Sequence, residues 1–195
     1  MAMARLILIN GAPASGKSTL ARRLAADPNA TTPLALVLDI DVVRGLLGRW
    51  MDERGDAGLL ARQHALAMIG VQLREGRDVI VPQLLARIDF VLQLEAASTT
   101  AGVPFIEIAL VSTPEAATER FRHRSANPED QTHRDAAALE SGTAERIPQM
   151  MESMLAVAAQ RPRTQYVETT DGDIEGTYAR LLAAIAADSE HPDDE

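Results

Sequence analysis

The residues best suited to chemistry in this 195-residue chain form a short glycine-containing stretch near the N-terminus. Gly11 is followed by Gly16, Lys17 and Ser18 in the spacing G-x-x-x-x-G-K-S. Backbone N–H groups of such a loop can surround a polyphosphate, with the lysine neutralising the β and γ phosphates and the serine hydroxyl offering an oxygen to Mg²⁺. The sequence therefore predicts binding of ATP and Mg²⁺ by Gly11, Ala12, Pro13, Ala14, Ser15, Gly16, Lys17, Ser18 and Thr19.

Two carboxylates and an arginine, Asp39, Asp41 and Arg44, follow the apolar run 34–38. If this run is a parallel strand, its carboxyl end lies at the ligand-binding edge of the sheet, beside Lys17. One carboxylate could hold a Mg²⁺-bound water while the other accepts a proton from an attacking hydroxyl. The alternative is that one or both cap the following helix. If the strand continues through Asp41, both carboxylates face the same side; if the chain turns helical there, Asp41 projects toward the acceptor and Asp39 stays near the metal.

Short apolar runs alternate with longer segments of helical periodicity, which is typical of βαβ units and a parallel sheet. We predict strands at residues 5–10, 34–38, 78–81, 104–111 and 165–169. Helical spacing is clearest in two sets, Ile88, Val91, Leu92 and Ala96, and Ile174, Tyr178, Leu181, Leu182 and Ile185. These patterns indicate an α/β fold with helices covering both faces of the sheet.

Composition limits the possible partners and compartments. The chain is 46% hydrophobic, so we expect one domain over residues 1–187, followed by an acidic tail at 188–195. The net charge of −9 disfavours long nucleic acids as partners. The absence of cysteine is typical of a reducing compartment, and the N-terminal apolar run is too short to span a membrane. We therefore expect a cytoplasmic protein with no membrane partner.

The phosphate-binding loop, followed by the pattern D-x-D-x-x-R at residues 39–44, resembles the small P-loop kinases. Within the AAA-type P-loop NTPases it is most similar to the chloramphenicol phosphotransferase, zeta-toxin and polynucleotide 5′-kinase branch, with shikimate kinase more distant. This resemblance implies a five-stranded parallel sheet, a small helical lid and transfer of the γ-phosphoryl group of ATP to a hydroxyl. It assigns the general base to Asp41, the Mg²⁺-water ligand to Asp39 beside Ser18, and substrate or phosphate binding to Arg44.

The sequence departs from many of these relatives at the end of the third predicted strand. Pro82 and Gln83 stand where an acidic metal-binding residue often follows the strand. Metal binding would then rest on Ser18 and, through water, on Asp39. Gln83 would orient substrate or water, and Arg87 would contact an anion. Alternatively, both are ordinary polar residues of a loop and a helix start.

Residues 113–124 have a helical pattern and precede a polar stretch that continues to about residue 142. The resemblance implies a lid at about 120–142 whose arginines close over the nucleotide. Arg120 and Arg124 are four apart and share a helix face, so both could compensate charge on the transferred group. The alternative is a basic helix end that complements its own dipole.

These residues together predict an ATP-dependent kinase that phosphorylates a hydroxyl of a small molecule, such as an antibiotic, sugar or nucleoside. The predicted catalytic residues are Lys17, Asp41, Arg120 and Arg124. The predicted substrate-binding residues are Asp41, Arg44, Gln83 and Arg87, and the metal site is Ser18 with Asp39. A polynucleotide 5′-hydroxyl kinase and a non-catalytic ATP-binding switch are the alternatives.

Overall fold

The structure is a computed structural model that describes residues 4–126 and 143–189. Five parallel strands form one sheet in the order β2-β3-β1-β4-β5. The strands are β1 Leu6–Asn10, β2 Leu36–Val37, β3 Val79–Gln83, β4 Phe105–Val111 and β5 Gln165–Glu168. The helices are α1 Lys17–Ala26, α2 Ile40–Gly45, α3 Arg54–Arg74, α4 Ile88–Ala101, α5 Pro114–Ala126, α7 Thr143–Ala158 and α8 Ile174–Ser189. This arrangement confirms the predicted α/β class and parallel sheet.

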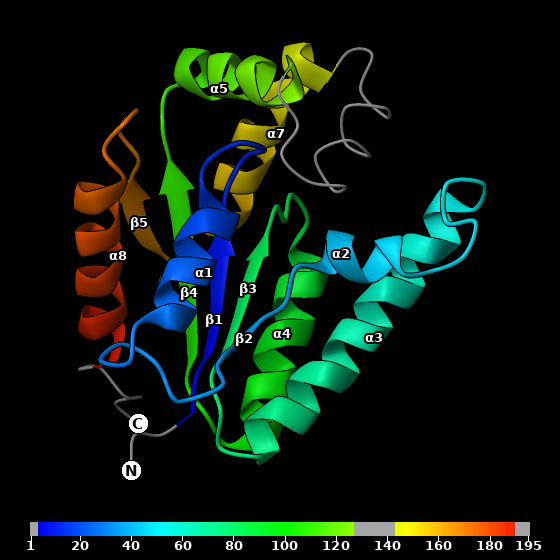
Figure 1. The fold of residues 1–195 in the computed structure, drawn as a ribbon, viewed down its shortest axis with the longest axis vertical. Coiled ribbons are helices and arrows are strands. Elements are labelled where there is room, and N and C mark those ends of the chain that lie inside the picture. The colour runs from blue at the N-terminus through cyan, green and yellow to red at the C-terminus, as the bar shows by residue number, and fades with distance from the viewer. Residues whose placement is uncertain (1–3, 127–142, 190–195) are drawn as a thin grey trace.

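Helices cover both faces of the sheet because the side chains of the central strand alternate between two apolar clusters. Ile7 and Ile9 of β1 pack with α1 and α8, whereas Leu6 and Leu8 pack with α3 and α4. All four side chains are fully buried. Figure 1 shows α5 beyond the carboxyl ends of the strands, where the loop between β1 and α1 also lies. The protein therefore has three layers, with its phosphate-binding loop at one edge of the middle layer.

Two strands end differently from the sequence prediction. Regular pairing of β2 covers only Leu36–Val37, at the outer edge of the sheet, because Leu34 has a left-handed backbone (φ 63°) and α2 begins at Ile40. Strand β3 instead continues to Gln83, past a proline. Pro82 lacks an N–H, but at this position the N–H would point toward β2, which has already ended, so no ladder bond is lost.

The last described helix extends past residue 187, where the domain was predicted to end. Helix α8 continues to Ser189, so Asp188, expected to begin the acidic tail, is still helical. Its side chain is buried and its Oδ2 lies 3.5 Å from Nη2 of Arg163. Residues 190–195 and the predicted lid beyond residue 126, up to 142, lie outside the described residues. Within the described ranges, no helix combines the length and apolarity that crossing a membrane requires.

The last residue of β1 fixes the position of the neighbouring β3–α4 loop. Asn10 is 2% exposed; its Nδ2 donates to the carbonyl of Leu85 (3.1 Å), and its Oδ1 accepts from the Leu85 N–H (2.9 Å). One side chain thus satisfies both backbone groups of a buried residue, and it does so immediately before the phosphate-binding loop begins.

Asn10→Ala should lower the free energy of unfolding by about 3 kcal/mol, because two buried backbone groups of Leu85 would lose their partners. The matched control is Asn29→Ala at an exposed asparagine, which should change stability by less than about 0.5 kcal/mol. Urea unfolding of both variants measures the difference. Equal stability of the two would show that Asn10 does not hold the β3–α4 loop.

Candidate functional site

The phosphate-binding loop, residues 11–16, has a backbone that few other sequences could adopt. Gly16 (φ 86°) and Ala14 (φ 61°) both have left-handed backbones, which cost little only at glycine. A Cβ on Gly11 would lie 2.6 Å from Oγ of Ser15, so a side chain there would collide inside the loop. The loop leads into α1 at Lys17, and no side chain caps the N-terminus of that helix. Its first N–H groups therefore remain available to an anion.

Two polar side chains of the loop are held without a strong partner. Oγ of Ser15 is buried and has no hydrogen-bond partner in the structure. Within the part of the chain that the structure describes, Nζ of Lys17 donates only to the carbonyl of Ala12, at 3.2 Å. Burial, and to a smaller extent the charge of Arg124, lower the pKa of Lys17 to about 8, while Asp41 and Asp39 act in the opposite direction. A polyphosphate in the loop would offset this loss of solvation.

Asp39 lies between the loop and helix α2. Its Oδ1 accepts the N–H of Asp41 at 3.0 Å and caps α2, which is the role that the capping alternative foresaw. Its Oδ2 lies 3.5 Å from Oγ of Ser18, so the same carboxylate also faces the predicted metal ligand. Burial raises the pKa of Asp39, and the nearby Asp41 carboxylate adds to the effect. A cation between Asp39 and Ser18 would relieve both causes of this shift.

Asp41 projects from the first turn of α2, as expected if the chain turns helical after Asp39. Its Oδ1 is 3.1 Å from Nη1 of Arg44, and Nε2 of Gln83 donates to its Oδ2 at a long 3.5 Å. Gln83 reaches this position because it pairs with Asn10 in the register of β3 with β1, directly beside the loop. Oε1 of Gln83 and Nε of Arg44 are buried and have no hydrogen-bond partner among the described residues. The structure thus brings together three of the four predicted substrate-binding residues.

The remaining predicted residues lie around this group. Arg87 is exposed at the N-cap of α4, and no hydrogen bond or ion pair links its side chain to the described residues. Nη2 of Arg120 donates to Oγ of Ser112 at 2.8 Å, while Nε of Arg120 is buried and finds no partner in residues 4–126 or 143–189. The guanidinium of Arg124 lies 5.3 Å from the ring centre of Phe121, and its charge helps to lower the pKa of Lys17. Arg120 and Arg124 of α5 are therefore both near the loop.

One partner at the site, Ser112, was not singled out from the sequence. Ser112 accepts a hydrogen bond from the guanidinium of Arg120 and so fixes its position. The guanidinium of Arg44 lies 4.6 Å from the ring centre of Trp50. Trp50 is 9% exposed, so it packs as a core aromatic and also supports Arg44. Ser112 carried one available signal, its place directly after β4 at the carboxyl edge of the sheet.

A pocket of about 360 Å³ opens beside the loop, on the side away from Asp41. Its walls come from the loop, the start of α1, Arg120 and the turn between β5 and α8. The lining residues are Ala14, Ser15, Gly16, Leu20, Arg120, Thr169, Thr170, Asp171, Gly172, Asp173, Ile174 and Thr177. The size suits a nucleoside, and its position extends the loop's polyphosphate site.

The family described as an AAA domain matches residues 6–149, about three quarters of the chain. The chain belongs to this AAA-domain family. No curated protein matches the chain significantly. Together with the sheet order, membership shows a P-loop kinase-like fold and nucleotide binding in general terms.

Solved structures share the fold over nearly the whole chain. A gluconokinase from Sinorhizobium meliloti 1021 has 18% identity and a TM-score of 0.62, with 98% of this chain and 97% of that chain covered. The tunicamycin resistance protein of Deinococcus radiodurans has 18% identity and a TM-score of 0.56, covering 94% and 95%. Chaetomium thermophilum Kti12, in complex with ADP-AlF3, has 19% identity and a TM-score of 0.64, covering 93% and 97%. At these identities the likeness shows the fold alone.

Nucleotide binding at pH 8 should take up about half a proton at Lys17, because its pKa is about 8 and added phosphate charge would raise it. The uptake should decline toward pH 7, where the amine is already protonated. Titration calorimetry of Mg²⁺-ADP in two buffers of different ionisation enthalpy measures the proton count. Lys17→Met is the control and should lose the uptake; the same count in both proteins would assign the proton to another group.

Proposed function

We propose that the protein transfers the γ-phosphoryl group of ATP to a hydroxyl group of a small molecule, with Mg²⁺ and with Asp41 as general base. The observation that carries the proposal is the juxtaposition, at one edge of the sheet, of an anion-binding loop and a carboxylate beside unpartnered polar atoms. Loop and helix N–H groups can hold phosphate, while Asp41, Arg44 and Gln83 present groups that suit a hydroxylated molecule.

The residues present fit ATP. The loop offers Lys17, the uncapped N-terminus of α1 and the unpartnered Oγ of Ser15 to the phosphates. The adjacent 360 Å³ pocket offers space for the nucleoside between the loop and residues 169–174. Bound ATP supplies the phosphoryl group, with ADP as its leaving group.

The residues also fit Mg²⁺. Oγ of Ser18 and Oδ2 of Asp39 are hard oxygen ligands 3.5 Å apart. Burial raises the pKa of Asp39, and a bound cation would offset this effect. Ser18 would contact the metal directly and Asp39 through water. Bound Mg²⁺ would neutralise phosphate charge.

In the proposed reaction Asp41 takes the proton of the acceptor hydroxyl as its oxygen attacks the γ phosphorus. A new oxygen–phosphorus bond forms, and the bond from the γ phosphorus to the β–γ bridging oxygen breaks. Lys17, Arg120 and Arg124 compensate the charge on the transferred group and the leaving oxygen. Arg44 forms an ion pair with Asp41 and stacks on Trp50, and these two contacts together hold the base in one orientation. Gln83 accepts a hydrogen bond from the acceptor through Oε1, and Arg87 contacts it from the exposed side.

The acceptor is proposed to be a small molecule, as the names of two structural neighbours, a gluconokinase and a tunicamycin resistance protein, suggest. The net charge of −9 also disfavours a long nucleic acid. A panel of sugars, sugar acids, nucleosides and hydroxylated antibiotics should therefore contain molecules that accelerate ADP release and gain a phosphoryl group by mass spectrometry. ATP binding without turnover on any member would favour the non-catalytic switch instead.

Asp41→Asn should lower kcat by about 10²–10⁴-fold and leave the dissociation constant of ATP nearly unchanged, because a general base acts in the transition state. Asp39→Asn is the matched variant and should mainly raise the Mg²⁺ concentration needed for activity. Steady-state kinetics and ATP titrations of both variants separate the two roles. Full activity of Asp41→Asn would remove this residue as the base, and an equal loss of ATP affinity in both would make the two carboxylates a single metal site.

A further inference from the structure

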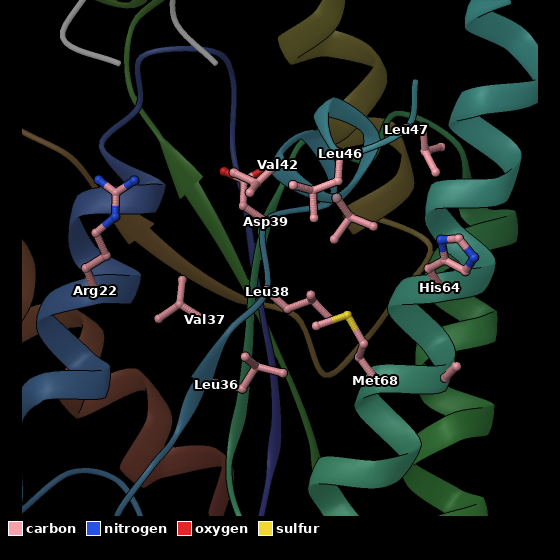
Figure 2. A pocket seen from close by; sticks show the side chains of 12 residues that line it. Arg22, Leu36, Val37, Leu38, Asp39, Val42, Leu46, Leu47, His64 and Met68 are labelled. Atoms are coloured by element: carbon pink, nitrogen blue, oxygen red, sulfur yellow. The ribbon is translucent and has the colours of Figure 1, made fainter. Parts of the chain in front are cut away.

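A second and larger pocket, of about 620 Å³, lies beside the edge strand β2. Figure 2 shows side chains from β2, α2 and α3 around it, with Arg22 of α1 on the opposite side. The lining residues are Arg22, Leu36, Val37, Leu38, Asp39, Val42, Val43, Leu46, Leu47, His64, Ala67 and Met68. Most of these are aliphatic.

This pocket and the proposed phosphoryl-transfer site lie on different faces of α2. Asp41 and Arg44 share one face of that helix, and neither lines the pocket. Val42 and Leu46, which do line it, are four apart and are turned roughly 150° away from the first pair at 100° per residue. The pocket also shares no residue with the 360 Å³ pocket beside the loop. The pocket therefore adjoins the phosphoryl-transfer site only at Asp39 and extends over a different face of α2.

Several aliphatic side chains at the pocket are left in contact with water. Leu46 is 80% exposed, Val42 45% and Met68 41%. Single exposed apolar residues are ordinary on a protein surface, but these three converge on one cavity from α2, its C-cap and α3. Binding of a ligand that covered them would be favoured by the burial of this apolar surface.

The polar groups at the pocket are few and spaced around its apolar centre. Arg22, Asp39 and His64 come from three different elements. Strand β2 adds backbone groups: the N–H groups of Leu36 and Leu38 donate to β3, so Val37 between them presents its N–H and C=O to the open edge. An apolar cavity of this volume with a few dispersed polar groups is typical of sites for small molecules.

We propose that this pocket binds a small molecule with a largely apolar body, such as a ring system with one polar substituent. Concave walls from four elements favour a small molecule over a protein face, which would need a broad contact area. The pocket wall includes Asp39, the cap of α2, and a ligand there would contact the helix that carries Asp41. The proposal does not depend on the phosphoryl acceptor.

Anilinonaphthalene sulfonate, which has an apolar ring body and one anionic group, is a suitable probe. It is titrated into the full chain with saturating Mg²⁺-ADP, to keep the probe out of the nucleotide pocket. We expect saturable binding of one probe per chain, with NMR shifts concentrated at Val37, Val42, Leu46 and Met68. Shifts concentrated elsewhere, or no saturable binding, would overturn the proposal.

A matched pair of variants tests the location by affinity. Met68→Gln removes an apolar contact from the pocket, while Leu92→Gln changes an equally exposed residue of α4 outside it (41% and 44%). Met68→Gln should weaken probe binding by about fivefold or more and Leu92→Gln by less than about twofold. Leu46→Gln, at a more exposed position, gives a second variant should Met68→Gln fold poorly.

Equal effects of Met68→Gln and Leu92→Gln would contradict the assigned site. Sedimentation of the wild type and of Met68→Gln tests the competing occupant, a second copy of the chain. A monomer in both cases supports the small-molecule site. A dimer that Met68→Gln dissociates would instead make this face a self-association surface.

Discussion

Parallel pairing of β1 with β3 is the constraint on which the site depends. The register sets Asn10 opposite Gln83, so the residue that precedes the phosphate-binding loop and the residue that approaches Asp41 are neighbours on adjacent strands. Asn10 then binds both backbone groups of Leu85 and holds the following loop against the same edge. Because all five strands are parallel, their carboxyl ends meet at this edge, and polar groups distant in sequence come together there.

The electrostatics of the site follow from this crowding. Lys17 loses solvation and lies near Arg124, so its pKa falls to about 8, while Asp39 loses solvation and lies near Asp41, so its pKa rises. Each group is thus less stable in its charged form than it would be in water, and a nucleotide with a metal ion would reverse both effects. Charged groups that are destabilised without a ligand and stabilised by a bound nucleotide and metal ion are expected at an anion-binding loop with an adjacent cation site.

The loop and the positions of the strands along the chain could be predicted from the sequence because both depend on local patterns: the G-x-x-x-x-G-K-S spacing and the apolar runs. The residues alone left two placements of Asp41 open, on a continued strand or on a helix, because the placement depends on where β2 ends, and that is decided by the start of α2 at Ile40. The pocket beside β2 also could not be predicted from the sequence. Val42, Leu46 and Met68 are apolar residue types typical of core positions, yet the structure leaves them exposed beside the short edge strand.

The central claim is that the loop, Asp39 and Asp41 act on one phosphoryl group. A crystal structure with ADP, Mg²⁺ and aluminium fluoride tests it most directly, because the fluoride occupies the position of the transferred group. The account predicts the β phosphate inside residues 11–17, the metal on Ser18 Oγ, and the Asp41 carboxylate facing the side of the fluoride opposite ADP. A nucleotide bound away from the loop, or an Asp41 carboxylate directed away from the fluoride, would contradict it.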